Sequence, residues 1–457
     1  MNVFDVIIIG FGKGGKTLAA EFAKRGQKVA IIERSEKMYG GTCINIGCIP
    51  TKTLVHQAKI AWGRKETAFE EKSDFYRQAI AVKETVTGAL RNKNYHNLAD
   101  NPNVTVYTGT GSFVSSDTVA VRTATEEILL TSKQIIINTG AETVIPPIDG
   151  VTDNPFVYTS TSIMELTNLP RRLVSVGGGY IGLEFASMYA SFGSQVTVLE
   201  SYPELIARED RDIAASVKET LEKKGIVFRM NAKVQSVKHV ENRAVVVFSD
   251  SQTGEVFELE ADAVLLATGR KPNTKDLNLE VAGVETDAHG AIIVDEYLKT
   301  TNPNIRAVGD VKGGLQFTYI SLDDYRIIRE DLFGDKKRKT SDRNPVAYSV
   351  FIDPPLARIG LNEDEARKQN LDVIIKKLPV MAISRAKTLG ETDGLLKAVI
   401  DKNTGEIVGC MLFAPDASEV INIVTMAMKT GQDYTFLRDF IFTHPSMSEA
   451  LNDLFAL

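Results

Sequence analysis

The sequence has few cysteines and no long apolar run, and both shortages narrow the class of protein. Three cysteines in 457 residues are too few for an extracellular disulfide scaffold and favour a reducing compartment, so we expect a cytoplasmic protein. No stretch reaches the ~18 consecutive apolar residues of a membrane helix, so we expect no membrane association. The N-terminal MNVFDVIIIG has no basic region and no small-residue cleavage site, which argues against a secretory signal.

An excess of positive charge is also missing. The chain has 53 Lys and Arg residues against 59 Asp and Glu, a net charge of −6. A protein that binds nucleic acid usually presents a basic face to the phosphates, so we expect no nucleic-acid partner. At roughly 150 residues per domain, the chain has room for about three domains. Cores of that size need no disulfide or metal to fold.

Two segments carry the pattern of a dinucleotide-binding βαβ motif. In the first, a buried strand is expected over Val3–Ile9 and leads into the glycine-rich turn Gly10–Gly15. A helix over Lys16–Arg25 and a second strand over Lys28–Ile32 follow, and that strand ends at Glu33.

The second segment repeats this order. A strand at Leu173–Val176 leads into the turn Gly177–Gly182, a helix continues to about Phe192, and a strand at Gln195–Leu199 ends at Glu200. The repetition predicts two nucleotide-binding domains in one chain.

The glycines of each GxGxxG motif have separate tasks. The first permits a tight turn, the second lets the backbone approach a pyrophosphate, and the third lets the helix pack against the strand. The pyrophosphate binds at the helix N-terminus, and the acid about 20 residues later accepts hydrogen bonds from ribose hydroxyls. The candidate residues are Gly10, Gly12, Gly15 and Glu33 in the first motif and Gly177, Gly179, Gly182 and Glu200 in the second. The alternative of two incidental glycine turns is disfavoured, because both copies have the full strand, helix and acid context.

Glu200 bears on the choice of nicotinamide cofactor. A carboxylate there repels a 2′-phosphate and binds a free 2′-hydroxyl, which favours NADH over NADPH. Arg208 lies close enough in the sequence to keep NADPH open as the alternative.

The rest of the chain also has an α/β pattern. We expect a helical region over Ala58–Ala99, short strands over Val104–Val121, and a linker at Asp335–Asn344. Further strands are expected at Gln134–Asn138, Ala263–Ala267, Ile305–Asp310, Ala347–Phe351, Leu395–Asp401 and Ile407–Phe413.

Cys43 and Cys48 form a candidate redox pair. On a regular α-helix, residues five apart have Cα atoms about 8.6 Å apart, whereas a disulfide needs less than ~7 Å. The pair can therefore close only on a distorted helix, and Gly47 and Pro50 provide the distortion.

Two other interpretations of the cysteines stay open. A metal site needs more ligands than the nearby His56 supplies, so we expect no metal. The cysteines could also be inert and buried, as we expect for Cys410 in its apolar run. A glycine-rich entry at Gly40–Gly41 and the nearby Lys52 suit a stabilised thiolate better.

The stretch Gly40–Lys52, GGTCINIGCIPTK, resembles the redox-active helix of the class I pyridine nucleotide–disulfide oxidoreductases. This family includes glutathione reductase, lipoamide dehydrogenase and mercuric reductase. The resemblance extends over the whole chain, through both nucleotide motifs, Ala267–Arg270, Gly309–Asp310 and His444–Glu449. It implies an α/β fold like that of glutathione reductase, with two Rossmann-like dinucleotide-binding domains and a C-terminal α/β dimerisation domain.

The resemblance also implies domain boundaries and a homodimer whose active site is shared between subunits. FAD would bind residues 1–150 and 271–335, NAD(P)H residues 151–270, and residues 345–457 would dimerise.

The resemblance gives cofactor roles to several residues. Glu33 would bind the adenosine ribose of FAD, Asp310 the ribityl chain, and Lys52 would lie near flavin N5 and pair with Glu184. Tyr180 would gate the nicotinamide pocket. Further cofactor contacts are expected at Gly41, Thr42, Thr139, Gly140 and Gly269.

In the same family pattern, Cys48 is the thiolate that faces the flavin and Cys43 is the thiol that attacks the substrate. His444, held by Glu449, is the acid/base from the partner subunit. Pro445 can start a helix that places Glu449 within its first two turns. A carboxylate on one ring nitrogen stabilises the imidazolium, which lowers the pKa of a neighbouring thiol. A surface histidine near the C-terminus is the alternative.

The stretch Leu315–Asp324 departs from the pattern of lipoamide dehydrogenase and glutathione reductase. Together with Ile44–Ile46 and Thr51–His56, it looks like the reactive-chlorine-resistance flavoproteins of bacteria. That subgroup implies reduction of a small oxidant, hypothiocyanous acid (HOSCN), with copper(II) also proposed. Lipoamide dehydrogenase and a flavin-binding sensor without turnover are the alternatives. Mercuric reductase is disfavoured because the chain has neither an additional N-terminal metal-binding domain nor a C-terminal cysteine pair.

Overall fold

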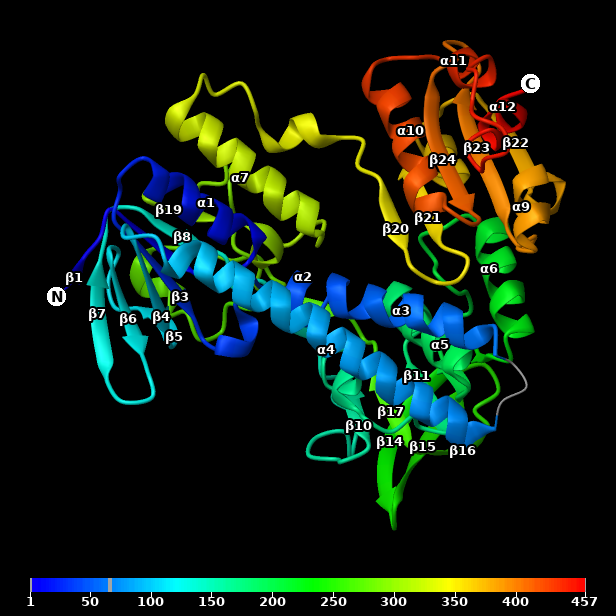
Figure 1. Cartoon of the computed structure of the whole chain (residues 1–457), viewed down its shortest axis with the longest axis horizontal. Coiled ribbons are helices and arrows are strands. Elements are labelled where there is room, and N and C mark those ends of the chain that lie inside the picture. The colour runs from blue at the N-terminus through cyan, green and yellow to red at the C-terminus, as the bar shows by residue number, and fades with distance from the viewer. Residues whose placement is uncertain (1, 65–67, 457) are drawn as a thin grey trace. The chain divides into compact units, whose positions relative to one another are not determined.

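The computed structural model describes residues 2–64 and 68–456 (Figure 1). It contains two compact units. Unit 1 consists of residues 1–53, 79–144 and 269–343, and unit 2 of residues 54–78, 145–268 and 344–457. The long helices α3 (Cys48–Trp62) and α4 (Phe69–Ala99) run from one unit into the other. The sequence-based boundaries near residues 150, 270 and 335–345 stay a prediction.

The centre of unit 1 is a five-stranded parallel sheet with the order β19-β8-β2-β3-β4. Its strands are β2 (Val6–Ile9), β3 (Val29–Glu33), β4 (Val104–Thr108), β8 (Ile135–Ile137) and β19 (Ile305–Ala307). Short apolar runs form them because a parallel strand is covered on both faces. The helices α1 (Lys13–Lys24) and α7 (Thr318–Phe333) share one core with this sheet.

The predicted single strand over Val3–Ile9 is wrong. The structure has two strands there, β1 (Asn2–Val3) and β2, which belong to different sheets. Asp5 separates them: it is exposed, and its Oδ2 accepts a hydrogen bond from the Lys28 backbone N–H at 2.7 Å. A carboxylate at that position cannot continue a strand buried on both faces.

Smaller sheets complete unit 1. The strand β1 joins a four-stranded sheet with the order β1-β7-β6-β5, and β9 pairs with β18. Their bounds are β5 Thr110–Phe113, β6 Thr118–Arg122, β7 Glu127–Thr131, β9 Ala141–Thr143 and β18 Arg270–Pro272.

Unit 2 contains a second five-stranded parallel sheet, with the order β10-β17-β11-β12-β13. The strands are β10 (Val157–Thr159), β11 (Arg172–Val176), β12 (Gln195–Leu199), β13 (Val227–Arg229) and β17 (Ala263–Leu266). The helices α5 (Tyr180–Phe192) and α6 (Arg211–Lys223) follow β11 and β12 in the chain. An antiparallel sheet of β14 (Ala232–Val240), β15 (Arg243–Asp250) and β16 (Val256–Ala261) adds to this core.

The C-terminal part of unit 2 is an antiparallel sheet with the order β20-β21-β24-β23-β22. Its strands are β20 (Tyr348–Val350), β21 (Leu356–Gly360), β22 (Val373–Pro379), β23 (Leu395–Asp401) and β24 (Ile407–Phe413). Its helices are α8 (Glu363–Lys368), α9 (Ser384–Leu389), α10 (Ala417–Lys429), α11 (Tyr434–Arg438) and α12 (Ala450–Leu454). The predicted α/β class is confirmed in both units.

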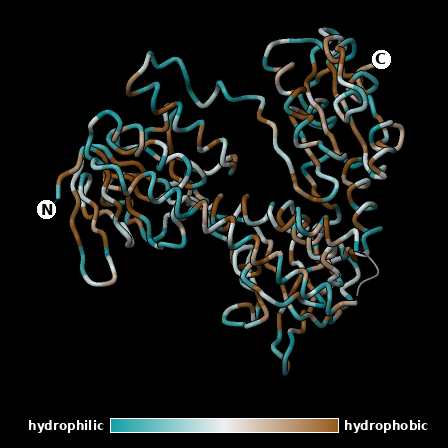
Figure 2. Tube along the Cα trace, in the orientation of Figure 1, coloured by the Kyte–Doolittle hydropathy of each residue, from teal (hydrophilic) through white to brown (hydrophobic). Residues whose placement is uncertain are grey.

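Two predicted segments differ in detail. The helical region expected over Ala58–Ala99 is two helices, α3 and α4, and residues 65–67 lie outside the described residues. The predicted linker Asp335–Asn344 is a nearly continuous hydrophilic trace in Figure 2. Its end is anchored, however, because Arg343 Nε donates to Asp323 Oδ2 at 2.6 Å.

None of the helices within residues 2–64 and 68–456 combines the length and the apolarity that crossing a membrane requires.

Candidate active site

The two candidate redox cysteines flank a break between two helices. The helix α2 (Thr42–Asn45) carries Cys43 and is capped by Ile46, and α3 begins at Cys48. The Cys43 side chain is half-buried and that of Cys48 is exposed. The regular helix that would hold them apart is therefore interrupted between them, as the sequence predicts.

The segment around Cys43 lies directly against the first glycine motif. Gly41 has φ +81°, and a Cβ added to it would lie 2.5 Å from the Cα of Gly12. Thr42 and Gly140 also meet, since a Cβ on Gly140 would lie 3.7 Å from Thr42 Oγ1. Unit 1 thus brings together four residues that the sequence assigns to the cofactor.

Polar side chains fix the shape of α2. The Asn45 amide donates to the carbonyls of Tyr39 and Gly41, at 2.9 and 3.0 Å. Its Oδ1 accepts from Arg91 Nε at 2.7 Å, which ties α2 to α4.

A lysine that the sequence analysis did not single out lies near Cys43. Lys16 Nζ donates to the Gly40 carbonyl at 3.2 Å and to Asn94 Oδ1 at 2.6 Å. Burial, together with the charge of Lys13, lowers the pKa of Lys16 to about 8. Lys16 in turn interacts electrostatically with Cys43 and favours its thiolate.

The two thiols lie in contact, and this contact acts on the pKa of Cys43. The hydrogen bond to Cys48, and then burial, raise the pKa of Cys43 above its usual range. Cys48 Sγ lies 3.5 Å from the hydroxyl of Thr318, the first residue of α7.

The first glycine motif is held by an acid and an amide. Glu33 Oε2 accepts from the Phe11 backbone N–H at 3.1 Å, and burial raises the pKa of Glu33. Asn138 Oδ1 accepts from the Gly15 N–H at 2.9 Å. Gly10 has φ +106°, and a Cβ there would lie 2.2 Å from the Asn138 carbonyl, so only glycine fits.

The other candidate flavin residues of unit 1 are placed by backbone contacts. Asp310 follows β19 in a short 3₁₀ helix, and burial raises the pKa of its carboxyl group. The preceding Gly309 donates its N–H to the buried Asp324 at 2.7 Å. Thr139 Oγ1 donates to the Asn273 carbonyl at 2.8 Å. Gly269 is exposed, with φ +102°.

The second glycine motif repeats the acid contact. Glu200 Oε2 accepts from the Gly178 N–H at 2.8 Å. A Cβ on Gly182 would lie 2.1 Å from the Gly177 carbonyl oxygen, whereas one on Gly179 would meet nothing within 4 Å. Gly179 thus leaves room for a ligand, and Gly182 allows the close packing of α5 on β11.

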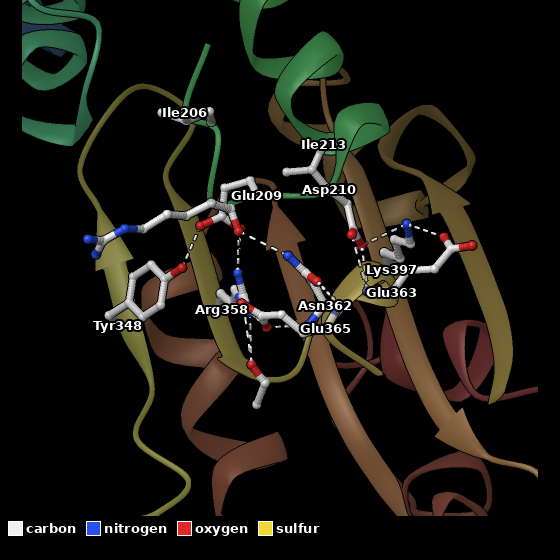
Figure 3. Close-up of polar contacts among 12 residues, drawn as sticks. Ile206, Glu209, Asp210, Ile213, Tyr348, Arg358, Asn362, Glu363, Glu365 and Lys397 are labelled. Atoms are coloured by element: carbon white, nitrogen blue, oxygen red, sulfur yellow. Dashed lines mark hydrogen bonds and ion pairs between the residues drawn. The ribbon is translucent and has the colours of Figure 1, made fainter. Parts of the chain in front are cut away.

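The hydroxyl of Tyr180 has two partners that the sequence analysis missed. It donates to Glu209 Oε1 at 2.5 Å and lies 3.2 Å from the hydroxyl of Tyr348. Tyr348 donates to the same Glu209 oxygen (Figure 3). Burial, and then the charge of Glu209, raise the pKa of both phenols well above the usual range.

Lys52 and Glu184, which the family pattern pairs, belong to different units. Lys52 lies half-buried on α3 in unit 1, and Glu184 lies buried on α5 in unit 2. Glu184 Oε1 accepts a hydrogen bond from the Phe351 backbone N–H at 2.7 Å. Their pairing stays a prediction.

His444 and Glu449 lie together. The His444 Nδ1 lies 3.0 and 2.9 Å from the two carboxylate oxygens of Glu449. The expectation that Glu449 lies inside a helix started by Pro445 is wrong, because Glu449 is the residue before α12. The contact forms across an irregular turn instead, and the imidazole remains largely exposed.

Residues beyond the predicted set also shape these sites. Among them, Asn138 had a sequence signal, because it follows the carboxyl end of a parallel strand, where ligands bind in such sheets. Thr318 lies in the stretch that departs from the family pattern. The spacing of residues along the sequence gives no indication that Lys16, Glu209 or Tyr348 belongs to these sites. Within residues 2–64 and 68–456, no group of three or more His, Cys, Asp or Glu side chains is arranged to hold a metal ion.

Comparisons with known proteins agree with this arrangement. A model of the pyridine nucleotide-disulphide oxidoreductases matches residues 4–324, and a model of their dimerisation domain matches residues 346–455. The probable pyridine nucleotide-disulfide oxidoreductase RclA of Escherichia coli (strain K12) is 50% identical over 100% of both chains. The mitochondrial dihydrolipoyl dehydrogenase of Pisum sativum is 33% identical over 98% of this chain and 90% of its own. The solved structure "Cu(II) complex of HOCl-induced flavoprotein disulfide reductase RclA from Escherichia coli" superposes with TM-score 0.94 at 50% identity, covering 100% of this chain and 99% of that chain.

Proposed function

The chain belongs to the pyridine nucleotide-disulphide oxidoreductase family, and from this membership we propose that it reduces hypothiocyanous acid with electrons from NADH. The family resemblance, the glutathione reductase-like α/β fold and the assignment as an FAD- and pyridine nucleotide-dependent flavin disulfide reductase are confirmed. The oxidant, the preference for NADH, the roles of individual residues and the cytoplasmic location are proposals.

The observation that carries the proposal is the Cys43–Cys48 pair across a helix break, against the first glycine motif. The residues of unit 1 fit FAD by the chemistry of their donors. The N-terminus of α1, whose helix dipole favours an anion, lies at the first glycine motif, and Glu33 lies at the end of the second strand. When bound, FAD carries a pair of electrons from the nicotinamide to the disulfide.

The chain's own residues then reduce the oxidant. The Cys43 thiol needs a base in order to attack, and the partner subunit's His444 takes its proton. The Cys43 sulfur attacks the sulfur of hypothiocyanous acid, and an S–S bond forms while the S–O bond breaks. The leaving hydroxide takes the proton back from the imidazolium and departs as water. The Cys48 thiolate then attacks the Cys43 sulfur, which releases thiocyanate and leaves the disulfide.

Two relatives support a small oxidant over lipoamide. The RclA protein, at 50% identity, is described as an HOCl-induced flavoprotein disulfide reductase, whereas the dihydrolipoyl dehydrogenase is 33% identical. The stretch Leu315–Asp324, which departs from the lipoamide dehydrogenase pattern, supplies Thr318 beside Cys48. The dimerisation-domain match at residues 346–455 supports a homodimer.

The test is turnover of the Cys43→Ser variant. We expect it to keep its flavin and its fold but to lose NADH-dependent reduction of hypothiocyanous acid by at least about 100-fold, because the attacking sulfur is gone. Cys410→Ala, which removes a buried thiol from β24, is the matched control and should keep the parent rate. Full activity in Cys43→Ser would overturn the proposal.

A panel of acceptors separates the alternatives. NADH oxidation is measured anaerobically with hypothiocyanous acid, lipoamide, glutathione disulfide and copper(II) in parallel. The proposal expects the highest kcat/KM with hypothiocyanous acid. Preference for lipoamide would assign the chain to the dihydrolipoyl dehydrogenases, and no turnover with any acceptor would support a sensor or scaffold.

A further inference from the structure

A buried carboxylate connects the second glycine motif to the C-terminal sheet. Glu209, in the loop before α6, accepts hydrogen bonds from two phenols through one oxygen, Oε1. Tyr180 is the first residue of α5 and lies within the glycine motif, directly after Gly179, and Tyr348 is the first residue of β20. We call Tyr180, Glu209, Tyr348 and Arg358 the phenol–carboxylate cluster.

Arg358 balances the charge of this carboxylate. Glu209 is 1% exposed, and its second oxygen, Oε2, has no hydrogen-bond partner within the described part of the chain. The nearest cation is Arg358, whose Nη1 lies 3.6 Å from Oε2. Figure 3 shows Arg358 between Glu209 and Glu365, which it also binds.

The backbone around the carboxylate is fixed as well. Arg358 Nη1 donates to the Arg208 carbonyl at 2.7 Å, and Asn362 Nδ2 donates to the same oxygen at 3.0 Å. Next to Glu209, Asp210 binds the buried Lys397 at 2.7 Å. The loop that carries Glu209 is therefore held by β21, β23 and the residue that caps α8.

These contacts restrain the tyrosine at the nucleotide motif. A ring whose hydroxyl donates to a buried, ionised carboxylate can move only if that charge-assisted bond breaks. A tyrosine that gates a pocket has to move when the nicotinamide enters. The hydrogen bonds that fix the ring consequently oppose binding, and the apparent dissociation constant rises as the binding-competent fraction falls.

We propose that Glu209 and Tyr348 are positioning residues that hold Tyr180 in place and so set the affinity of the enzyme for its nicotinamide dinucleotide. This inference rests on the proposed role of Tyr180 as the gate. The residues that determine affinity then include one from the C-terminal sheet, 168 positions from Tyr180 along the chain.

The test uses Tyr348→Phe and Glu209→Gln in the FAD-loaded enzyme. Each weakens the anchor of Tyr180, so each should bind NAD⁺ about 3- to 10-fold more tightly in a calorimetric titration. The KM for NADH, measured with ferricyanide as acceptor, should fall in parallel while kcat changes less than about twofold. Ferricyanide keeps the test independent of the natural oxidant.

A double-mutant cycle separates positioning from a general structural effect. In a Tyr180→Phe background, Tyr348→Phe and Glu209→Gln should not change NAD⁺ affinity further, because the hydroxyl that they anchor is gone. Tyr158→Phe, which removes a phenol that donates to the Pro155 carbonyl, is the matched control and should bind NAD⁺ like the parent.

Several results would overturn the inference. One is an unchanged NAD⁺ affinity in Tyr348→Phe that retains its flavin and thermal midpoint. Another is an equal change in the Tyr180→Phe background. If Glu209→Gln does not fold, Tyr348→Phe still decides, since it leaves the carboxylate in place. Failure of the proposed oxidant would appear in the acceptor panel and leave the NAD⁺ titrations untouched.

Discussion

The two glycine-rich turns of this chain use the same acid contact. Glu33 accepts from the Phe11 N–H and Glu200 from the Gly178 N–H, in each case 22 residues earlier in the chain. In both, the acceptor is the acid at the end of the second strand and the donor is the residue after the first glycine. The acid therefore braces the turn in addition to any contact with a ribose.

The helices that follow are fixed in different ways. At the start of α1, backbone N–H groups of Gly14 and Gly15 donate to Ser321 and Asn138, side chains that belong to the same unit. At the start of α5, it is a side chain, Tyr180, that is held, through its hydroxyl. The first contacts hold the backbone of α1, whereas the second holds one side chain of α5, which can rotate while its helix stays in place. The comparison thus predicts that a bound cofactor exchanges less readily at the first motif than at the second.

The third glycines give the largest expected difference between the motifs. A Cβ on Gly182 would lie 2.1 Å from the Gly177 carbonyl oxygen, whereas a Cβ on Gly15 would lie 2.8 Å from Asn138 Oδ1 and 3.0 Å from the equivalent Gly10 carbonyl oxygen. We expect Gly182→Ala to lower the free energy of unfolding by about 3 kcal/mol or more and Gly15→Ala by about 1–2 kcal/mol.

Denaturant unfolding measures both losses. Gly88→Ala is the control: Gly88 lies within α4, a Cβ there meets nothing within 4 Å, and alanine should stabilise the helix by up to about 1 kcal/mol. Equal losses at Gly15 and Gly182 would contradict the assigned difference in packing.

Replacing the acid of each motif should give the next largest effect. We expect the Glu33 variant to affect FAD binding and the Glu200 variant to affect NADH binding. Glu33→Ala leaves the buried Phe11 N–H without its acceptor and should lower the FAD retained per chain. Glu200→Ala should raise the KM for NADH about tenfold and narrow the preference over NADPH, since one charge-assisted hydrogen bond contributes about 1.5–3 kcal/mol.

Flavin absorbance per chain and steady-state KM values for both dinucleotides check this pair. Each variant serves as the control for the other. A loss of FAD from Glu200→Ala, or a raised KM for NADH in Glu33→Ala at full flavin content, would mean that the motifs are assigned to the wrong cofactors.

The smallest expected effect concerns Lys16, whose counterpart in the second motif is the buried Leu183. Burial lowers the pKa of Lys16 to about 8. Between about pH 8 and the ordinary lysine pKa of 10.5, the unfolded chain binds more protons than the folded one, so stability rises with pH. Below pH 8 both states are charged, and the full cost of burying the charge remains.

Replacing Lys16 with the residue of the other motif, Lys16→Leu, should remove this dependence. We expect the unfolding free energy of the parent, relative to the variant, to increase by about 1 kcal/mol between pH 7 and pH 10. Lys24→Leu, an exposed cation at the other end of α1, should retain the parent profile. If the difference in unfolding free energy between the parent and Lys16→Leu does not change with pH, Lys16 is not a buried lysine with a lowered pKa.

The bounds of several strands and helices could be predicted from the sequence alone. The strand, turn and helix of the second motif match β11, α5 and β12 closely, and Leu395–Asp401 and Ile407–Phe413 match β23 and β24. Apolar runs punctuated by glycine specify these elements over a few residues. Where one charged residue interrupts such a run, as Asp5 does, the pattern alone predicted a single strand and was wrong.

The side-chain contacts around the two glycine motifs could not be predicted from the sequence, because the partners are far apart in the chain. Gly15 and Asn138 are separated by 123 residues, and Glu209 and Tyr348 by 139. Nothing in the spacing of either pair indicates a contact. The His444–Glu449 contact, over five residues, was predicted, although the turn that makes it is not the expected helix.

The buried position of Cys410 has a practical consequence. It lies fully enclosed in β24, and burial raises the pKa of its thiol, so it is inert while the sheet is closed. A maleimide added to the native, reduced protein should label the other two cysteines and spare this one. Cys410 can then be labelled only when the C-terminal sheet opens. The rate at which Cys410 is labelled therefore measures how often that sheet opens.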